Sequence, residues 1–135
     1  MMIRRGKPED AERCLSIFRE DKETYWDIAD FVRSAKDKDV VFLVAEEDKK
    51  VIGYILGFIV PTKRTEALIH ETRVERAKRK KGIGTELVNA FCEEIFKRGV
   101  EVILAEVEPE LLKFYVDACK FEESRKWIEV AKKKQ

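Results

Sequence analysis

The sequence has few of the residues that build disulfide frameworks and metal sites. It contains three cysteines and one histidine among 135 residues. Cys14, Cys92 and Cys119 are widely spaced and form no C-x-x-C motif, so neither a disulfide framework nor a zinc site is indicated. A catalytic pair of a cysteine with His70 has no supporting signature. Cys14 and Cys92 fall on the apolar faces of expected helices, as small core residues do.

Long apolar runs and a charge excess are also missing. No apolar stretch approaches the roughly 20 residues that a membrane-spanning helix needs, and the N-terminus lacks the apolar core of a secretory signal. We therefore expect a cytoplasmic protein without a membrane segment. The net charge is only +1 although 41% of residues are charged, which argues against a dedicated nucleic-acid-binding domain. A length of 135 residues suits a single domain, residues 1–135.

The sequence does contain a regular succession of short strands and helices. Apolar runs predict strands at residues 3–5, 40–45, 51–60, 65–74, 100–107 and 121–131. Helical spacing and starting signals predict helices from residue 8, from residue 24 or 25 to about 35, at 85–98, and from residue 109. This order predicts a mixed α/β (α+β) domain. Its first strands are expected to be antiparallel, and the strands around the third helix parallel.

The stretch between the fourth strand and the third helix, residues 74–87, reads V-E-R-A-K-R-K-K-G-I-G-T-E-L. A basic turn with two glycines before a helix favours an anion site, because first-turn N–H groups lack partners and glycines allow close approach. A solvated basic turn is the alternative on residue types alone. A P-loop is excluded because neither glycine is followed by lysine. A dinucleotide fingerprint is excluded because Leu87 stands where its third glycine is needed.

The pattern that remains is R-x-x-G-x-G, filled by residues 79–84. It resembles the acetyl-CoA signature of the GNAT superfamily of N-acetyltransferases, Q/R-x-x-G-x-G/A, and the element order resembles the GNAT fold through nearly the whole chain. The resemblance implies that strands four and five separate at the glycine loop and that acetyl-CoA, as cosubstrate, lies between them. The residues it implies for cosubstrate binding are Thr72, Arg73, Val74, Arg79, Lys80, Lys81, Gly82, Ile83, Gly84 and Thr85.

A second part of the resemblance lies in the last helix. The family commonly shows N-x-x-A-x-x-F-Y there, then a short spacer and G-F. Here Phe114 and Tyr115 give the aromatic pair, but the spacing to Phe121 is one residue longer and Lys120 replaces the glycine. Counting back from Phe121 with the family's usual spacing places Val116, not Tyr115, at the position of the family's catalytic tyrosine. We prefer Tyr115, because a one-residue adjustment at a helix end is easier than loss of the aromatic pair.

The resemblance implies transfer of an acetyl group from acetyl-CoA to a primary amine of a small molecule or a protein. Tyr115 would protonate the leaving thiolate, and the backbone N–H of Val74 would polarise the carbonyl. Glu106 and His70 are the candidate bases, and a chain of water molecules is the alternative to both. Strand alternation sends His70 and Glu71 to opposite faces, with His70 on the face of Val74 and Glu71 a solvated residue.

Several alternatives stay open. Tyr25 and Trp26 start the expected second helix, where core packing is favoured over an aromatic wall for an acceptor. A non-catalytic CoA-binding sensor is favoured by the altered Tyr–Phe spacing. An anion- or nucleic-acid-binding domain would use residues 76–81, although the net charge argues against it. Only 14 residues follow Phe121, where the family usually has two strands, so a homodimer is an expectation to test.

Overall fold

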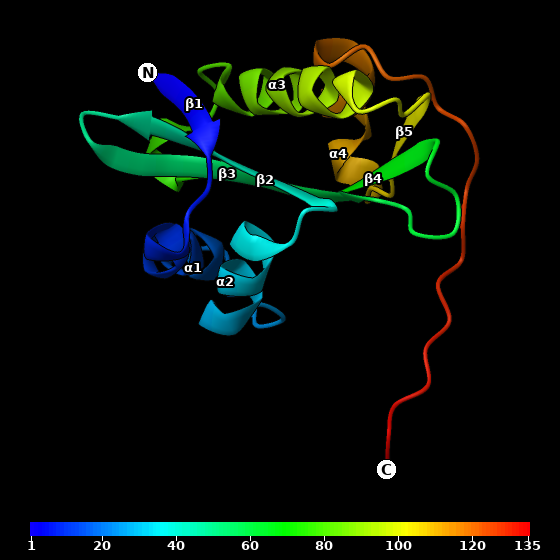
Figure 1. Cartoon of the computed structure of the whole chain (residues 1–135), viewed down its shortest axis with the longest axis horizontal. Helices are drawn as coiled ribbons and strands as arrows, with labels where there is room; N and C mark the ends of the chain where they lie inside the picture. Colours follow the sequence, from blue (N-terminus) through cyan, green and yellow to red (C-terminus); the bar gives the residue numbers. More distant parts are fainter.

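The computed structural model describes residues 1–135 and centres on one five-stranded sheet (Figure 1). The strands lie in their order along the chain: β1 (Met2–Arg5), β2 (Val40–Glu47), β3 (Lys50–Ile59), β4 (Glu66–Val74) and β5 (Val102–Ala105). The helices are α1 (Ala11–Arg19), α2 (Ile28–Lys36), α3 (Ile83–Lys97) and α4 (Pro109–Lys113). The first four strands are antiparallel and the β4–β5 pair is parallel, so the predicted fold class is confirmed.

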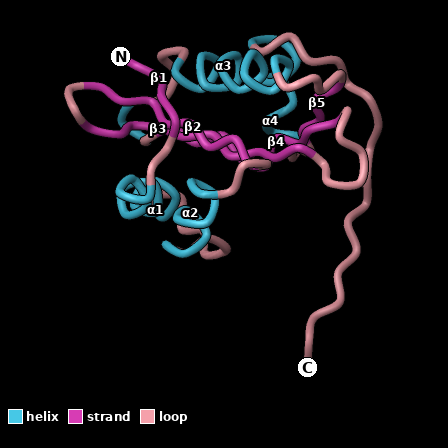
Figure 2. Tube along the Cα trace, in the orientation of Figure 1, coloured by secondary structure: helices cyan, strands magenta, loops and turns pink.

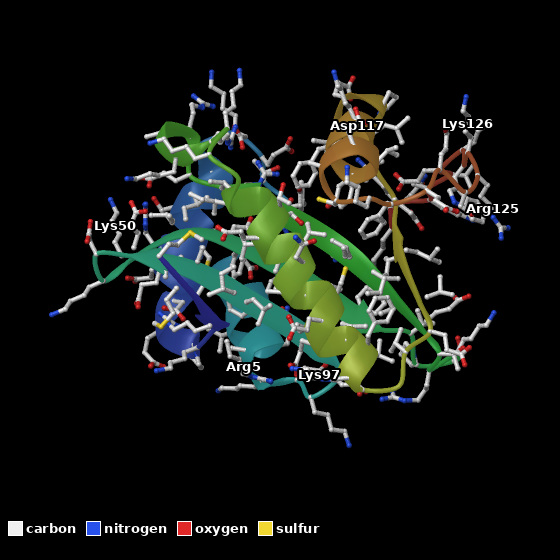
Figure 3. The ribbon with its side chains drawn as sticks, turned by 90° about the horizontal axis from the view of Figure 1, so that it is seen from above. Arg5, Lys50, Lys97, Asp117, Arg125 and Lys126 are labelled. Carbon is white, nitrogen blue, oxygen red and sulfur yellow. The ribbon has the colours of Figure 1, made fainter.

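The helices cover both faces of the sheet. Helices α1 and α2 lie on one face and α3 on the other (Figures 1 and 2), and α3 crosses the strands obliquely (Figure 3). Strand β3, K-V-I-G-Y-I-L-G-F-I, is apolar on both of its faces and is therefore buried by both helical layers. One core, which includes Ile55 and Phe91, lies under α3, and a second, which includes Phe31 and Tyr54, lies under α1 and α2. None of the helices combines the length and the apolar composition of a membrane span.

Helix α2 begins later than the sequence suggests. Asp27 and Asp30 form a capping box: the Asp27 carboxylate accepts from the Asp30 N–H at 3.1 Å, and the Asp30 carboxylate accepts from the Asp27 N–H at 2.9 Å. This exchange starts the helix at Ile28. Tyr25 and Trp26 consequently lie in the connection before α2, where their side chains reach across to β4, and the predicted start at residue 24 or 25 is wrong.

Strands β4 and β5 are hydrogen bonded only over the first half of β4. Their pairing runs from Glu66 opposite Val102 to Ile69 opposite Ala105, and β4 then continues to Val74 paired with β3 only. A register shift between Leu56 and Gly57 in the β3–β4 ladder falls at the same level. The expected separation of strands four and five is therefore present.

The predicted strand at 121–131 is wrong. Residues 122–135 adopt no regular structure, and their backbone makes no hydrogen bond to the rest of the chain. Figures 1 and 2 show this segment leaving the body of the protein as an extended loop. Strand propensity is realised only when a neighbouring strand supplies a ladder, and in this structure the segment pairs with no strand.

The contact of α3 with the sheet depends on Gly57. A Cβ atom at this position would lie 2.4 Å from Cζ of Phe91 and 2.6 Å from the Leu68 carbonyl oxygen. We predict that Gly57→Ala lowers the free energy of unfolding by about 1–3 kcal/mol, the usual effect of overpacking a core. The matched control is Gly53→Ala on the same strand, where the nearest atom is the Arg73 carbonyl oxygen at 3.1 Å. Urea unfolding of both variants measures the difference, and equal losses would contradict this packing.

Candidate functional site

Beyond Ile69, β4 pairs with β3 but not with β5, and we call this stretch the unpaired part of β4. It presents hydrogen-bonding groups to the gap between β4 and β5. The Glu75 N–H donates to the Ile52 carbonyl at 2.7 Å, so residue 75 faces β3. Successive residues of an antiparallel strand alternate between facing the partner and facing away. The backbone groups of Thr72 and Val74 therefore point away from β3, toward the space that β5 has left. An extended ligand can pair with them there as an added strand does.

The glycine loop leaves a row of backbone donors free. No N–H group from Lys80 to Thr85 donates a hydrogen bond within the protein. Gly82 is the N-cap of α3, with a φ of 84°, and no atom lies within 4 Å of the place that a Cβ would occupy. Lys80 also has a positive φ, 64°. Consecutive amides in such a turn at a helix start form a concave site for an anion.

A single carboxylate holds this loop in place. Asp21, just after α1, forms salt bridges with Arg73 at 2.5 Å, Arg76 at 3.1 Å and Arg79 at 2.6 Å. Arg79 also donates from Nε to the Val74 carbonyl at 2.8 Å. Hydrogen bonds from Arg79, and then from Arg76 and Arg73, lower the pKa of Asp21 to about 2. The arginine of the R-x-x-G-x-G pattern thus braces the loop against the end of β4 and does not point at an anion.

Of the three lysines in the loop, one is paired with a carboxylate and two are not. Lys78 is paired with Glu47 at 2.8 Å. Lys80 and Lys81 are exposed and form no salt bridge. Two free lysines next to a row of free amides suit steering of an anionic ligand by charge and retention by the backbone.

Tyr115 lies against the gap from the side of α3 and α4. Its side chain is only 6% exposed, packs against the rings of Phe114 and Phe121, and places Oη 3.2 Å from Oγ1 of Thr72. Burial raises the pKa of Tyr115, so the hydroxyl carries its proton at neutral pH and is a proton donor. The structure therefore brings this predicted residue to the unpaired part of β4.

The long spacing between Tyr115 and Phe121 has a structural explanation. Residues 114–118 form one π-helical turn, closed by the Cys119 N–H on the Phe114 carbonyl at 3.1 Å. A π turn accommodates one extra residue without changing the direction of what precedes it. Lys120 then has a φ of 64°, a conformation in which glycine is the residue without strain. The aromatic pair is preserved by these two adjustments.

Strand alternation fails at the register shift. Leu56 lies opposite Glu71 and Gly57 opposite Ile69, so His70 is the extra residue of a β-bulge. His70 stacks edge-on against Trp26 with ring centroids 4.8 Å apart, and Trp26 also donates to Glu71. The expectation that His70 and Glu71 face opposite sides is therefore wrong, because the bulge turns both toward the α1–α2 connection.

Glu71 is buried, so the prediction of a solvated residue at this position is wrong. Its side chain is only 8% exposed. Its carboxylate accepts from Tyr25 Oη, from Trp26 Nε1 at 3.0 Å, from Tyr54 Oη at 2.5 Å and from Arg73 Nη2 at 2.9 Å. Four donors use the lone pairs of the carboxylate, so Glu71 fixes the α1–α2 connection over β4 and has little capacity left to accept a substrate proton.

The two candidate bases lie where the strands separate. Ile69 and Ala105 form the last β4–β5 pair; His70 is the next residue on β4, and Glu106 directly follows β5. Both are exposed, and Glu106 forms no salt bridge. Each stays a predicted base, and their positions flank the opening of the gap.

Known proteins resemble this chain in sequence and in fold. A profile of the acetyltransferase (GNAT) family matches residues 9–121. Over 67 residues the chain is 37% identical to an L-2,4-diaminobutyric acid acetyltransferase of Virgibacillus pantothenticus, a match that spans 50% of this chain and 42% of that relative. A second protein of that name, from Marinococcus halophilus, is 28% identical over 67 residues and is covered over 39% of its length. The chain thus matches less than half the length of these relatives.

Solved structures share the fold at low identity. An aminoglycoside acetyltransferase from an uncultured soil metagenomic sample, in complex with sisomicin, superposes with a TM-score of 0.82 at 14% identity, covering 99% of this chain and 96% of that one. AAC(6')-Iy, in complex with the bisubstrate analogue CoA-S-monomethyl-acetylneamine, gives a TM-score of 0.82 at 18% identity, covering 98% and 97%. At these identities the likeness establishes the fold alone.

The Asp21 cluster makes a prediction about stability and pH. The pKa of Asp21 is lowered from 3.8 to about 2 in the folded protein. A carboxylate with a lowered pKa stabilises the fold above pH ~4, and this contribution is lost as the pH falls to ~2. Asp21→Asn is therefore expected to be less stable than the parent at pH 7, and the difference should shrink between pH 4 and pH 2.

Urea unfolding at a series of pH values measures this difference. The control is Asp117→Asn, since Asp117 (labelled in Figure 3) is exposed and forms no salt bridge. A stability difference for Asp21→Asn that stays constant down to pH 2 would show that its ion pairs are not formed in solution.

Proposed function

The chain belongs to the acetyltransferase (GNAT) family, and from this premise we propose that residues 1–135 form one catalytic domain that transfers an acetyl group from acetyl-CoA to a primary amine. The observation that carries the proposal is the row of free amides from Lys80 to Thr85, continuous with the unpaired part of β4. A ligand with a pyrophosphate and an extended arm suits this site, because the pyrophosphate can bind the free amides and the arm can lie along the unpaired part of β4.

Each part of the site has a proposed share in binding. The amides of Lys80–Thr85 hold the pyrophosphate, because the helix start and Gly82 give it donors and room. The pantetheine arm pairs with the N–H and carbonyl of Thr72 and with the N–H of Val74, on either side of Arg73. The Val74 carbonyl already accepts a hydrogen bond from Arg79. The Asp21 salt bridges keep these two parts in register, because Arg79 joins the loop to the Val74 carbonyl.

The chemistry is proposed to occur near Thr72. Tyr115 Oη lies beside the Thr72 side chain, and the sulfur and carbonyl of a thioester are adjacent atoms. The N–H that polarises the carbonyl is therefore better assigned to Thr72 than to Val74, which lies nearer the glycine loop. Tyr115 donates its proton to the departing thiolate, a role that its raised pKa and burial suit.

The acceptor amine is proposed to enter from the α1–α2 side. Tyr25 and Trp26, held by Glu71, form an aromatic wall beside His70. His70 and Glu106 flank the opening and are the groups proposed to take the proton that the ammonium must lose. Small-molecule amines fit the names of the relatives, and the amine of a protein stays within the same proposal.

The non-catalytic alternative loses its main support in this structure. It depended on the longer spacing between Tyr115 and Phe121, and the π turn accommodates that residue while keeping Tyr115 at β4. The roles that we propose for Tyr115 as proton donor and for His70 and Glu106 as bases would have no use in a simple sensor.

Binding is tested by two matched glycine variants. Gly82 and Gly99 both have a positive φ, of 84° and 89°, and neither has an atom within 4 Å of a built Cβ. A valine at either position strains the backbone alike, but only at position 82 does it fill the space proposed for the pyrophosphate. Gly82→Val should abolish the rise in melting temperature that acetyl-CoA gives the parent, and Gly99→Val should keep it.

The result has two clear ways to fail. A parent protein whose melting temperature does not change with millimolar acetyl-CoA would contradict the proposed cosubstrate. A Gly82→Val protein that responds as the parent does would contradict the location of the site.

The acid role is tested by Tyr115→Phe, which removes one oxygen and keeps the packing. We predict that kcat falls by roughly 100-fold or more, the usual range for loss of general-acid catalysis, while the affinity for acetyl-CoA stays within about threefold of the parent. Thiol release across a panel of primary amines measures kcat, and the melting shift with acetyl-CoA is the control for binding. An unchanged kcat under conditions where chemistry limits the rate would remove Tyr115 from the mechanism.

A further inference from the structure

The side chain of Arg73 lies on the face of β4 that carries the α1–α2 connection. Its guanidinium is 5.3 Å from the centroid of the Phe18 ring of α1, and the side chain is only 15% exposed. The side chain of the preceding residue, Thr72, lies on the other face, against Tyr115. Arg73 therefore contributes backbone to the strand beside the gap, while its charge is directed away from the gap.

The guanidinium of Arg73 joins three groups. Nη1 donates to Asp21 at 2.5 Å, and Nη2 donates to Glu71 at 2.9 Å and to Tyr25 Oη at 3.2 Å. The planar fork of an arginine holds such partners in a fixed arrangement, which a single ammonium cannot do. Nε is buried and has no hydrogen-bond partner, so the two Nη groups alone connect the guanidinium to its surroundings.

The two carboxylates depend on Arg73 to different degrees. Asp21 also pairs with Arg76 and Arg79, and both pairs are independent of Arg73. Glu71 has no second cation, because its other three donors are two tyrosine hydroxyls and one indole N–H. A buried carboxylate that loses its only counter-ion is strongly destabilised. Removal of the Arg73 charge therefore affects Glu71 far more than Asp21.

Glu71 in turn holds the aromatic wall of Tyr25 and Trp26. Residues 23–26 make no backbone–backbone hydrogen bond, so this part of the α1–α2 connection is held over β4 by its side chains. Tyr25 Oη donates to Oε1 of Glu71, and Trp26 Nε1 donates to Oε2 at 3.0 Å. The Trp26 ring also contacts the ring of His70, with centroids 4.8 Å apart. The position of the wall consequently depends on a carboxylate that Arg73 neutralises.

We propose that Arg73 is a positioning residue for the acceptor amine. As the counter-ion of Glu71 it keeps Tyr25 and Trp26 in place beside the opening of the gap. This inference rests on the proposed function, since it takes the aromatic wall as the acceptor side of the site. The Arg73 side chain touches neither substrate and acts through Glu71 and the two aromatic side chains, so its loss weakens binding of the amine and spares binding of acetyl-CoA.

The variant Arg73→Met tests the proposal, because methionine keeps much of the length and removes the charge. The KM for the amine should rise at least roughly tenfold, the order expected when a hydrogen bond to a charged group is lost. The KM for acetyl-CoA should stay within about threefold of the parent, because Asp21 keeps two arginines. Thiol release with the amine that the parent acetylates best measures both constants.

The matched control is Arg76→Met. Arg76 is another of the three arginines on Asp21, but it contacts neither Glu71 nor the aromatic wall. Its replacement should leave the KM for the amine at the parent value. If circular dichroism shows that Arg73→Met is unfolded, Arg73→Lys takes its place. One ammonium keeps the charge but cannot hold all three partners of the fork, so the KM for the amine should still exceed that of Arg76→Met.

The contrary outcomes separate this proposal from the proposed function. An active parent whose folded Arg73 variants keep the parent KM for the amine would overturn the role of Arg73 and leave the acetyltransferase assignment intact. Equal rises in both KM values would show general damage to the site and would overturn it as well. A parent that releases no thiol with any amine would contradict the proposed function itself, and this role with it.

Trp26 reports on the wall without turnover. Trp26 and Trp127 are the two tryptophans of the chain, so a Trp127→Phe background leaves Trp26 as the single probe. In this background Arg73→Met should move the emission maximum to longer wavelength, because Trp26 leaves Glu71 and becomes more exposed to water. Arg76→Met should not move it. An emission maximum that is the same with and without the Arg73 charge would show that the wall does not depend on Arg73 and would overturn the proposal.

Discussion

The separation of β4 from β5 after the Ile69–Ala105 pair is the constraint on which the site depends. A strand that loses its neighbour half-way leaves N–H and C=O groups that must find other partners. The β-bulge at His70 lies at the same level and changes which side chains face which layer. Beyond it, Thr72 faces Tyr115 under α3, while Glu71 faces the connection between α1 and α2. The bulge thus makes one face of β4 contact Tyr115 and the other contact the α1–α2 connection.

Two carboxylates hold the surroundings of this gap in position. Asp21 gathers three arginines from β4 and the glycine loop, and Glu71 gathers the donors of the α1–α2 connection. Arg73 contacts both, since it donates to Asp21 and to Glu71. The side that we propose to bind acetyl-CoA and the side that we propose to bind the amine are therefore coupled through a single arginine.

The sequence predicted the parts of the fold that follow from local patterns. The order of strands and helices, the glycine loop and the aromatic pair could be recognised because periodicity and turn residues are local. The bulge could not, since a register shift depends on the partner strand, and the orientation of His70 was consequently wrong. The role of Glu71 was missed because its four donors come from three separate segments. The last strand was wrong because propensity does not reveal whether a partner is present in the same chain.

The most direct test of the account is amide hydrogen exchange with and without acetyl-CoA. The account predicts that the amides of Lys80–Thr85, together with those of Thr72 and Val74, exchange more slowly when acetyl-CoA is present, because they gain hydrogen bonds that the free protein does not supply. The Glu75 amide, already bonded to Ile52, should change little. Protection confined to other segments, or none at the glycine loop, would contradict the assignment of this gap as the acetyl-CoA site.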